Sequence, residues 1–193
     1  MRIAYLLAPG LLLSYGVVRL LDGLDGSHGP GPAWTIGHVL FLGSLAAFGL
    51  VAVDLSRRVR RVPGLLALAG TVLGLAGTVL GLVAFAHVVV VDLIVGFGAA
   101  DRAEMNLRYS DHDTPLDPVA PLFPIGLTVL LLLVGIARRG TYWSPVLALA
   151  GFAAIVTDLD LLPVGALLLL GALWPVVRAD APRFPPVHAG KEG

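Results

Sequence analysis

Cysteine is absent from this chain of 193 residues, and lysine occurs only once, as Lys191. Without cysteine the protein has no disulfide, no thiolate metal ligand and no cysteine nucleophile. Because Lys191 lies outside every apolar stretch, no buried lysine is available for a Schiff base, which excludes a retinal-type chromophore protein. Charged residues are scarce as well, at 13%, against roughly 25% in a typical soluble domain.

Hydrophobic residues make up 57% of the chain and are gathered in long runs. Since a membrane-spanning helix needs about 20 apolar residues, the sequence predicts an all-α, polytopic integral membrane protein with a bundle of six transmembrane helices and no second soluble domain. We expect residues 1–178 to form this single domain and the Pro-rich residues 179–193 to be a disordered cytoplasmic tail. The predicted spans cover residues 3–21, 34–53, 64–91, 119–137, 144–157 and 161–177.

Basic residues gather in alternate loops, which predicts the orientation of the chain in a cell (plasma) membrane. With both termini in the cytoplasm, ten of the 13 basic residues are inside, and only Arg19, Arg102 and Arg108 are outside. Ten of the 13 acidic residues fall on the outer side. The formal net charge is zero, which gives no reason to expect nucleic-acid binding. The arginine-rich composition and layout are typical of small six-span proteins of high-GC bacteria.

A glycine stripe runs along the third apolar stretch, where AGTVLGL occurs twice in succession from Ala69. At about 100° per residue, its four glycines fall within about 60° of one another on a helix. The stripe contains two small-xxx-small units, a spacing that allows close approach of two membrane helices. We expect a helix–helix contact, either within the bundle or between two copies in a homo-oligomer, through Gly70, Gly74, Gly77 and Gly81.

Ionisable residues inside the spans are rare, and burying charge in lipid is costly, so each one is a candidate for function. The predicted topology brings six of them to the outer side at a similar depth. We interpret five of them as candidate catalytic residues, namely His38, His87, Asp92, Asp158 and Asp160. The sixth, Arg19, is a candidate substrate-binding residue.

A structural role is an open alternative for each of these residues. Asp160 can cap the following helix, Asp92 can simply end an apolar run, and a histidine in a span can bond a neighbouring carbonyl group. No GxSxG elbow, P-loop or other strong motif is present.

Three kinds of chemistry remain possible for the cluster, and the cofactor stays unknown. His38, His87 and one carboxylate would suit a zinc ion, although no HxxxH or HExxH pair exists. The two histidines could also hold one haem. Alternatively, Asp158 or Asp160 would act as a proton donor toward a lipid-like substrate. We expect the outer segment 99–109 to form a short interfacial helix, with a lid over the cluster as one role for it. Asp111, His112 and Asp113 could contact a divalent cation loosely.

The first functional hypothesis is therefore a membrane-embedded enzyme that performs acid–base isomerisation or cyclisation of a hydrophobic, isoprenoid- or lipid-like small molecule. The second is a small transporter or channel subunit. The third is a non-catalytic assembly partner that packs through the glycine stripe. In each case the lipid bilayer is the expected environment.

Overall fold

The structure, a computed structural model, describes residues 1–25, 28–60, 64–137 and 142–179. The described residues contain helices and turns and no strands, which confirms the predicted all-α class. The predicted disordered tail lies outside the described residues, apart from Ala179, which ends the last helix.

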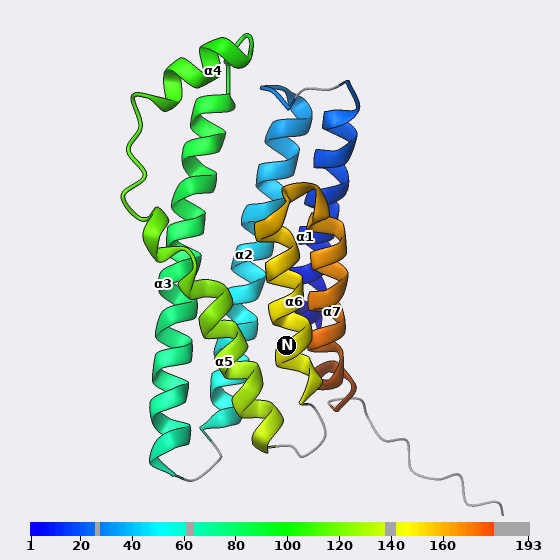
Figure 1. Ribbon diagram of the computed structural model, residues 1–193, viewed down its shortest axis with the longest axis vertical. Helices are drawn as coiled ribbons and strands as arrows, with labels where there is room; N and C mark the ends of the chain where they lie inside the picture. The colour runs from blue at the N-terminus through cyan, green and yellow to red at the C-terminus, as the bar shows by residue number, and fades with distance from the viewer. Residues whose placement is uncertain (26–27, 61–63, 138–141, 180–193) are drawn as a thin grey trace, which may run out of the picture.

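Six long helices and several short ones follow one another along the chain (Figure 1). The α-helices are α1 (Arg2–Asp22), α2 (Pro32–Val59), α3 (Leu65–Gly96), α4 (Arg102–Tyr109), α5 (Leu122–Ala137), α6 (Trp143–Thr157) and α7 (Leu162–Ala179). The 3-10 turns are η1 (Gly23–Asp25), η2 (Asp117–Val119) and η3 (Leu159–Leu161). Besides the six long helices there is one short α-helix, α4, which is the helix that the sequence predicts in segment 99–109.

Five of the helical segments are long and apolar enough to cross a membrane, and α6 is a shorter apolar helix. They agree with the six predicted stretches, but several ends differ. α2 continues to Val59 and α3 to Gly96, beyond the predicted ends at 53 and 91. Both extensions are helical because no proline or glycine interrupts the chain there until Gly96.

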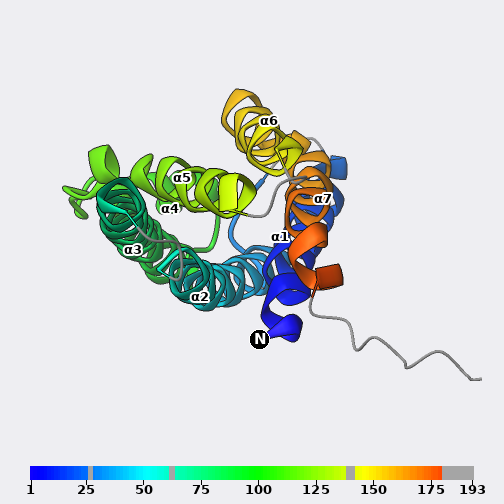
Figure 2. The same ribbon diagram turned by 90° about the horizontal axis from the view of Figure 1, so that it is seen from below.

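The six long helices form a closed ring when viewed along the bundle (Figure 2). Going round the ring, each neighbouring pair is in contact, in the order α1, α2, α3, α5, α6 and α7, and α7 packs back on α1. Side chains from all six helices form one continuous hydrophobic core. Helix α2 also contacts α5 across the ring, and the candidate site is a cavity that these helices enclose.

The glycine stripe of α3 packs against α5 of the same chain. A Cβ atom on Gly74 would lie 3.0 Å from Leu130 Cγ, and one on Gly81 would fall on the backbone of Phe123. On α5, Gly126 faces the backbone of Thr78 in the same way. Since α5 fills this face, no second copy of the protein is needed to cover it.

The helices of the ring do not all extend to the same height in the molecule. α1, α2 and α3 extend to the upper end of the molecule, whereas α5 and the turn between α6 and α7 stop well below it (Figure 1). The 32 residues of α3 correspond to about 48 Å of helix, against a hydrocarbon core of about 30 Å. The upper parts of α2 and α3 therefore stand free of α5, α6 and α7.

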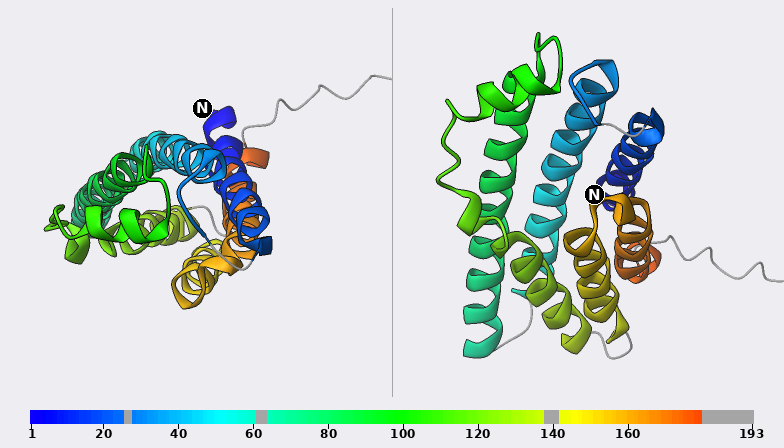
Figure 3. Two further views of the ribbon diagram at one scale, coloured as in Figure 1. Left: turned by 90° about the horizontal axis from the view of Figure 1, so that it is seen from above. Right: turned by 45° about the horizontal axis from the view of Figure 1, so that its top comes forward.

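The short helix α4 lies at this upper end. Seen from above, it runs over α5 on the inner side of α3 (Figure 3), and the view from below also places it in line with α5. Met105 of α4 packs with Val91 and Val95 of α3 in a small hydrophobic cluster that Trp34 and Tyr109 extend. α4 therefore covers the space above α5 as an ordered, packed element.

Candidate functional site

An apolar cavity of about 250 Å³ lies inside the ring of helices. Its lining comes from α1, α2, α3, α5, α6, η3 and α7, which makes it a product of the whole fold rather than of one segment. Two of its lining residues, Val156 and Leu159, are 83% and 49% exposed. The cavity therefore opens sideways at the upper end of α6, toward the surroundings of the bundle.

Aromatic rings dominate the cavity wall. The rings of Tyr15 and Phe41 are stacked with centroids 5.0 Å apart. Phe85 contacts Phe41 at 6.2 Å and Phe123 at 6.1 Å, both edge to face. Phe48 and Phe152 pack on Phe123 at 5.3 and 5.2 Å. All six rings line the cavity, and five of them belong to the seven phenylalanines of the chain.

Asp92 of α3 is the only aspartate or glutamate in the lining of this cavity. One carboxylate oxygen, Oδ2, lies 3.4 Å from Nε2 of His38 on α2. The other, Oδ1, accepts a hydrogen bond of 2.6 Å from the hydroxyl group of Tyr109 on α4. Asp92 is thus held from two sides by residues of two other helices, while its side chain stays 21% exposed.

The contacts of His38 determine which of its two ring nitrogens carries the hydrogen atom. Nδ1 lies 2.7 Å from the carbonyl oxygen of Trp34, and a carbonyl oxygen only accepts, so Nδ1 must be the donor. In the neutral ring, Nε2 then presents a lone pair to Asp92. The imidazole nitrogen Nε2 and the carboxylate oxygen Oδ2 therefore face each other as an acid–base pair beside the cavity.

Trp34 contacts both residues of the His38–Asp92 pair. Its indole Nε1 donates a hydrogen bond of 3.0 Å to the backbone carbonyl of Asp92, and its ring lies 4.2 Å from that of His38. The indole sits directly against Gly96, where any Cβ atom would collide with it. The absence of a side chain at Gly96 is what lets α2 and α3 approach closely enough for the His38–Asp92 contact.

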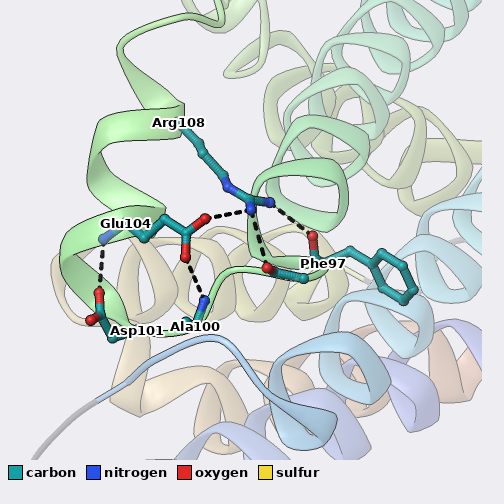
Figure 4. A network of polar contacts seen from close by, with 6 residues as sticks. Phe97, Ala100, Asp101, Glu104 and Arg108 are labelled. Atoms are coloured by element: carbon teal, nitrogen blue, oxygen red, sulfur yellow. Dashed lines mark hydrogen bonds and ion pairs between the residues drawn. The ribbon is translucent and has the colours of Figure 1, made fainter.

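A network of polar contacts holds α4 on the end of α3 (Figure 4). Asp101 accepts a hydrogen bond from the Glu104 backbone N–H at 2.8 Å, and Glu104 Oε2 accepts one from the Ala100 N–H at 2.8 Å. Arg108 donates to the carbonyl oxygens of Phe97 and Gly98 at 3.0 and 3.1 Å, and to Glu104 at 2.6 Å. These contacts satisfy the free backbone groups at the end of one helix and the start of the next.

Two pKa values in α4 reflect these contacts. The hydrogen bond from Ala100, followed by that from Arg108, lowers the pKa of Glu104 below its usual value. Burial and the hydrogen bond to Asp92 raise the pKa of Tyr109 above its usual value. Glu104 therefore stays ionised and Tyr109 stays a hydrogen-bond donor under ordinary conditions, and both keep α4 in place.

Arg19, Asp158 and Asp160 lie together at the rim of the cavity rather than in its lining. Arg19 Nε is 3.3 Å from Asp160 Oδ1, and the Asp160 side chain is 50% exposed. Asp158 Oδ1 accepts the Asp160 backbone N–H at 2.9 Å, so the capping residue of this turn is Asp158 and not Asp160. No described hydrogen bond or ion pair joins these acids to His38 or Asp92.

His87 does not join the His38–Asp92 pair. It precedes Asp92 by five residues, which places it about 140° away around the helix, and it is not part of the cavity lining. Its Nδ1 atom is buried and has no hydrogen-bond partner among the described residues. Within that part of the chain no group of three histidine or carboxylate side chains is arranged to hold a metal ion. The three-ligand zinc arrangement considered from the sequence is therefore not formed there.

Several residues of the site were not among the sequence candidates. Tyr109 is the last residue of α4, a helix that the sequence predicts, but no sequence pattern indicates that its hydroxyl group reaches Asp92. The aromatic wall had a weak signal, because Phe41 and Phe48 are seven residues apart and so share one face of α2. The other rings come from separate helices, and only the closed ring brings them together.

A second polar cluster lies at the opposite end of α1 and α2. The Tyr5 hydroxyl group donates to Asp54 Oδ2 at 2.8 Å, and Arg58 Nε donates to the same oxygen at 2.7 Å. The Arg58 guanidinium group also lies 5.9 Å from the centre of the Tyr5 ring. The three side chains join α1 to α2, so the cluster has the character of a structural contact.

The fold and the site together define a class: a multi-pass, membrane-type helical bundle with a central aromatic cavity and one carboxylate in its wall. Comparison with protein-family models, with curated proteins and with solved structures finds no match for this chain.

Proposed function

We propose that the protein is a membrane-embedded enzyme that binds a small hydrophobic, isoprenoid-like molecule in the aromatic cavity and transfers protons to and from it. The observation that carries the proposal is the position of Asp92, the one carboxyl group in an otherwise apolar wall, with His38 at 3.4 Å. Distances of this kind are often long in an empty site and shorten when substrate binds.

The reaction class that suits this arrangement is the isomerisation or cyclisation of a carbon–carbon double bond. The Asp92 carboxyl group donates its proton to one carbon of the double bond, and the π-electron pair forms the new C–H bond. The resulting carbocation is stabilised by the faces of the surrounding rings. Loss of a proton from a neighbouring carbon to the carboxylate restores a double bond and regenerates the acid. No oxidant, reductant or further reactant is needed.

His38 and Tyr109 act on the acid and not on the substrate in this proposal. His38 holds or returns the proton through Nε2, and its own orientation depends on the Trp34 carbonyl oxygen. Tyr109 stabilises the carboxylate through Oδ1, so proton exchange takes place at Oδ2. Arg19 and Asp160 lie at the entrance, where they would contact a polar end of the substrate.

The orientation belongs to the proposal as well. The basic residues favour cytoplasmic termini in the cell membrane, which would place α4 and the cavity opening on the outer side. A substrate dissolved in the outer leaflet would then enter sideways past Val156 and Leu159.

Deuterium incorporation is the direct test. The purified protein in lipid nanodiscs is incubated in D₂O with short-chain prenyl alcohols, and carbon-bound deuterium is measured by mass spectrometry. We expect incorporation with the wild-type protein and its loss in Asp92→Asn, which cannot donate the proton.

Asp113→Asn is the matched control, because Asp113 is an exposed carboxylate outside the cavity lining. It should leave incorporation unchanged. Equal incorporation by Asp92→Asn, or none by the wild-type protein with any of the prenyl alcohols, would contradict the proposal.

A further inference from the structure

The side chains that line the cavity favour a ligand of one sign of charge. It contains six aromatic rings and one carboxylate, and none of its lining residues is an arginine, lysine or histidine. Aromatic faces carry partial negative charge and attract cations, most strongly where water is excluded. Both features of the wall therefore favour a positively charged group over a neutral or negative one.

We propose that the cavity binds a lipophilic cation, a tertiary or quaternary ammonium group attached to a short hydrocarbon or aryl chain, and that each bound cation releases one proton. This inference rests on the assignment of the cavity as the ligand site in the proposed function, but not on catalysis there. The ammonium group lies beside Asp92 and against the ring faces, while the chain extends toward the opening past Leu159.

The release of a proton follows from the His38–Asp92 pair. With one proton bound, the pair has no net charge and offers little attraction to a cation. When that proton leaves, Asp92 is a carboxylate facing a neutral imidazole, and the pair carries one negative charge. A cation stabilises this second state. Proton and cation therefore compete for the same pair, and by linkage each weakens the binding of the other.

The size of the cavity limits the chain of the ligand. Pockets for drug-sized molecules measure about 300–1,000 Å³, and this cavity of about 250 Å³ is slightly smaller. It suits a compact ammonium group with one short chain and excludes a lipid with two acyl chains. The adjoining recess at Arg19 and His28 measures about 10 Å³, the size of one water molecule, and adds no second ligand site.

The remaining charges near the pair do not oppose a cation. Arg19 is the one described cation beside the site, and Asp160 at 3.3 Å compensates its charge. Helices α5 and α6 carry no ionisable side chains in their described residues. The titratable groups that contact or act on Asp92 from other elements are His38 of α2, Tyr109 of α4 and Tyr15 of α1. Arg19 of α1 adjoins Tyr15 and pairs with Asp160 of η3.

Two isosteric ligands test the sign of charge directly. Benzyltrimethylammonium and neopentylbenzene have the same shape and differ only in the charged nitrogen that replaces a carbon atom. Binding of each to the full-length protein in nanodiscs is measured by calorimetry, with empty nanodiscs subtracted. We expect saturable binding of the ammonium compound, at least tenfold tighter than that of the hydrocarbon, and at least tenfold weaker in Asp92→Asn.

Proton release is measured in the same titration in weak buffer, with an indicator dye. We expect one proton per bound cation and weaker binding as the pH is lowered from about 8 to about 5, the range in which histidine side chains generally change charge. In His38→Gln both the released proton and the pH dependence should disappear, while the cation still binds. Phe85→Leu, which removes one ring and keeps an apolar side chain, should weaken the cation and not the hydrocarbon.

Binding of the hydrocarbon as tightly as the ammonium compound would overturn the inference, as would unchanged cation affinity in Asp92→Asn. Cation binding without proton release would overturn the competition between proton and cation. These failures are separable from those of the proposed function. A cavity that takes only neutral ligands can still catalyse deuterium incorporation, and a cavity that binds cations can do so with no incorporation at all.

Discussion

Among single residues, Asp92 differs from the other acidic side chains at its end of the bundle because each of its carboxylate oxygens has a partner from another helix. Asp158 accepts a hydrogen bond only from its own turn, and Asp160 contacts Arg19 at the exposed rim. Five residues before Asp92, His87 faces another direction. Carboxylate and histidine side chains at a similar depth thus have different partners. The rotation of each helix about its axis decides which partner a side chain can reach.

Removing one hydroxyl group should loosen α4 without unfolding the bundle. Tyr109→Phe keeps the ring in its hydrophobic cluster and deletes only the hydrogen bond to Asp92. A hydrogen bond to a charged group contributes about 1.5–3 kcal/mol, so we expect backbone amides of α4 to exchange with solvent at least tenfold faster. Mass-spectrometric hydrogen exchange measures this.

Tyr142→Phe is the matched control, because Tyr142 is 58% exposed and precedes α6, which begins at the end of the bundle opposite α4. It should leave the exchange of α4 unchanged. Unchanged exchange in Tyr109→Phe as well would mean that the hydroxyl group does not hold α4 in place.

At the scale of the elements, the contact between α3 and α5 depends on glycine at some positions much more than at others. The four stripe glycines look equivalent in the sequence, since all share one face of the helix. In the structure Gly81 meets the backbone of Phe123, whereas a Cβ atom on Gly77 would be in ordinary contact with the Leu122 carbonyl oxygen at 3.5 Å. The difference arises because Gly77 lies opposite Gly126, which has no side chain, whereas Gly81 lies directly against the backbone of Phe123.

We therefore expect Gly81→Ala and Gly77→Ala to have opposite effects. At Gly81 the added methyl group forces the two helices apart, and overpacking of this kind costs about 1–3 kcal/mol. At Gly77 the methyl group fits, and alanine favours the helix by up to about 1 kcal/mol over glycine. Thermal denaturation in detergent, followed by circular dichroism, should show a lower midpoint for the first variant only. Equal midpoints would mean that the two helices are not in contact at Gly81.

Acid should release the contact between α4 and α3. The pKa of Glu104 is lowered in the folded protein by the hydrogen bond from Ala100 and then by Arg108. Its contribution is therefore complete above the ordinary glutamate pKa of about 4.3 and is lost as the pH falls through the lower folded value. The NMR signal of the Ala100 amide should shift, and its exchange should accelerate, over that acidic range. In Glu104→Gln this pH dependence should be absent, and its persistence would assign it to another group.

At the scale of the whole molecule, the ring of six helices has two different ends. One carries α4, the opening of the cavity and the His38–Asp92 pair, and the other carries the Tyr5–Asp54–Arg58 cluster, the end of α5 and the start of α6. Because α5, α6 and α7 are shorter than α2 and α3, the cavity opens at the side, below α4. A ligand would reach it from within the membrane.

The lack of native cysteine permits a direct test of the proposed orientation. Single cysteines are introduced by Ser110→Cys, after α4, and Tyr142→Cys, at the start of α6, both at exposed positions. A membrane-impermeant thiol reagent added to intact cells should label the first and not the second. After permeabilisation both should react. The reverse pattern would place the cavity opening on the cytoplasmic side.

Local composition and helical periodicity were enough to predict the all-helical class, the apolar stretches and the glycine stripe, because each depends on residues within a few turns of one another. The short helix α4 was also predicted, because the segment 99–109 has the composition of an interfacial helix. The partner of the stripe was not predictable, because any neighbouring helix or second copy could have filled that face.

The tertiary structure alone decided which polar groups meet and what surrounds them. His38 pairs with Asp92 because Gly96 admits the Trp34 indole and draws α2 against α3. The aromatic wall exists because five helices turn one ring each, or two, toward a common centre. Such contacts depend on the rotation and closest approach of helices far apart in the chain, and no local pattern encodes either quantity. The amino-acid sequence therefore determined the spans, and the packing of those spans determined the site.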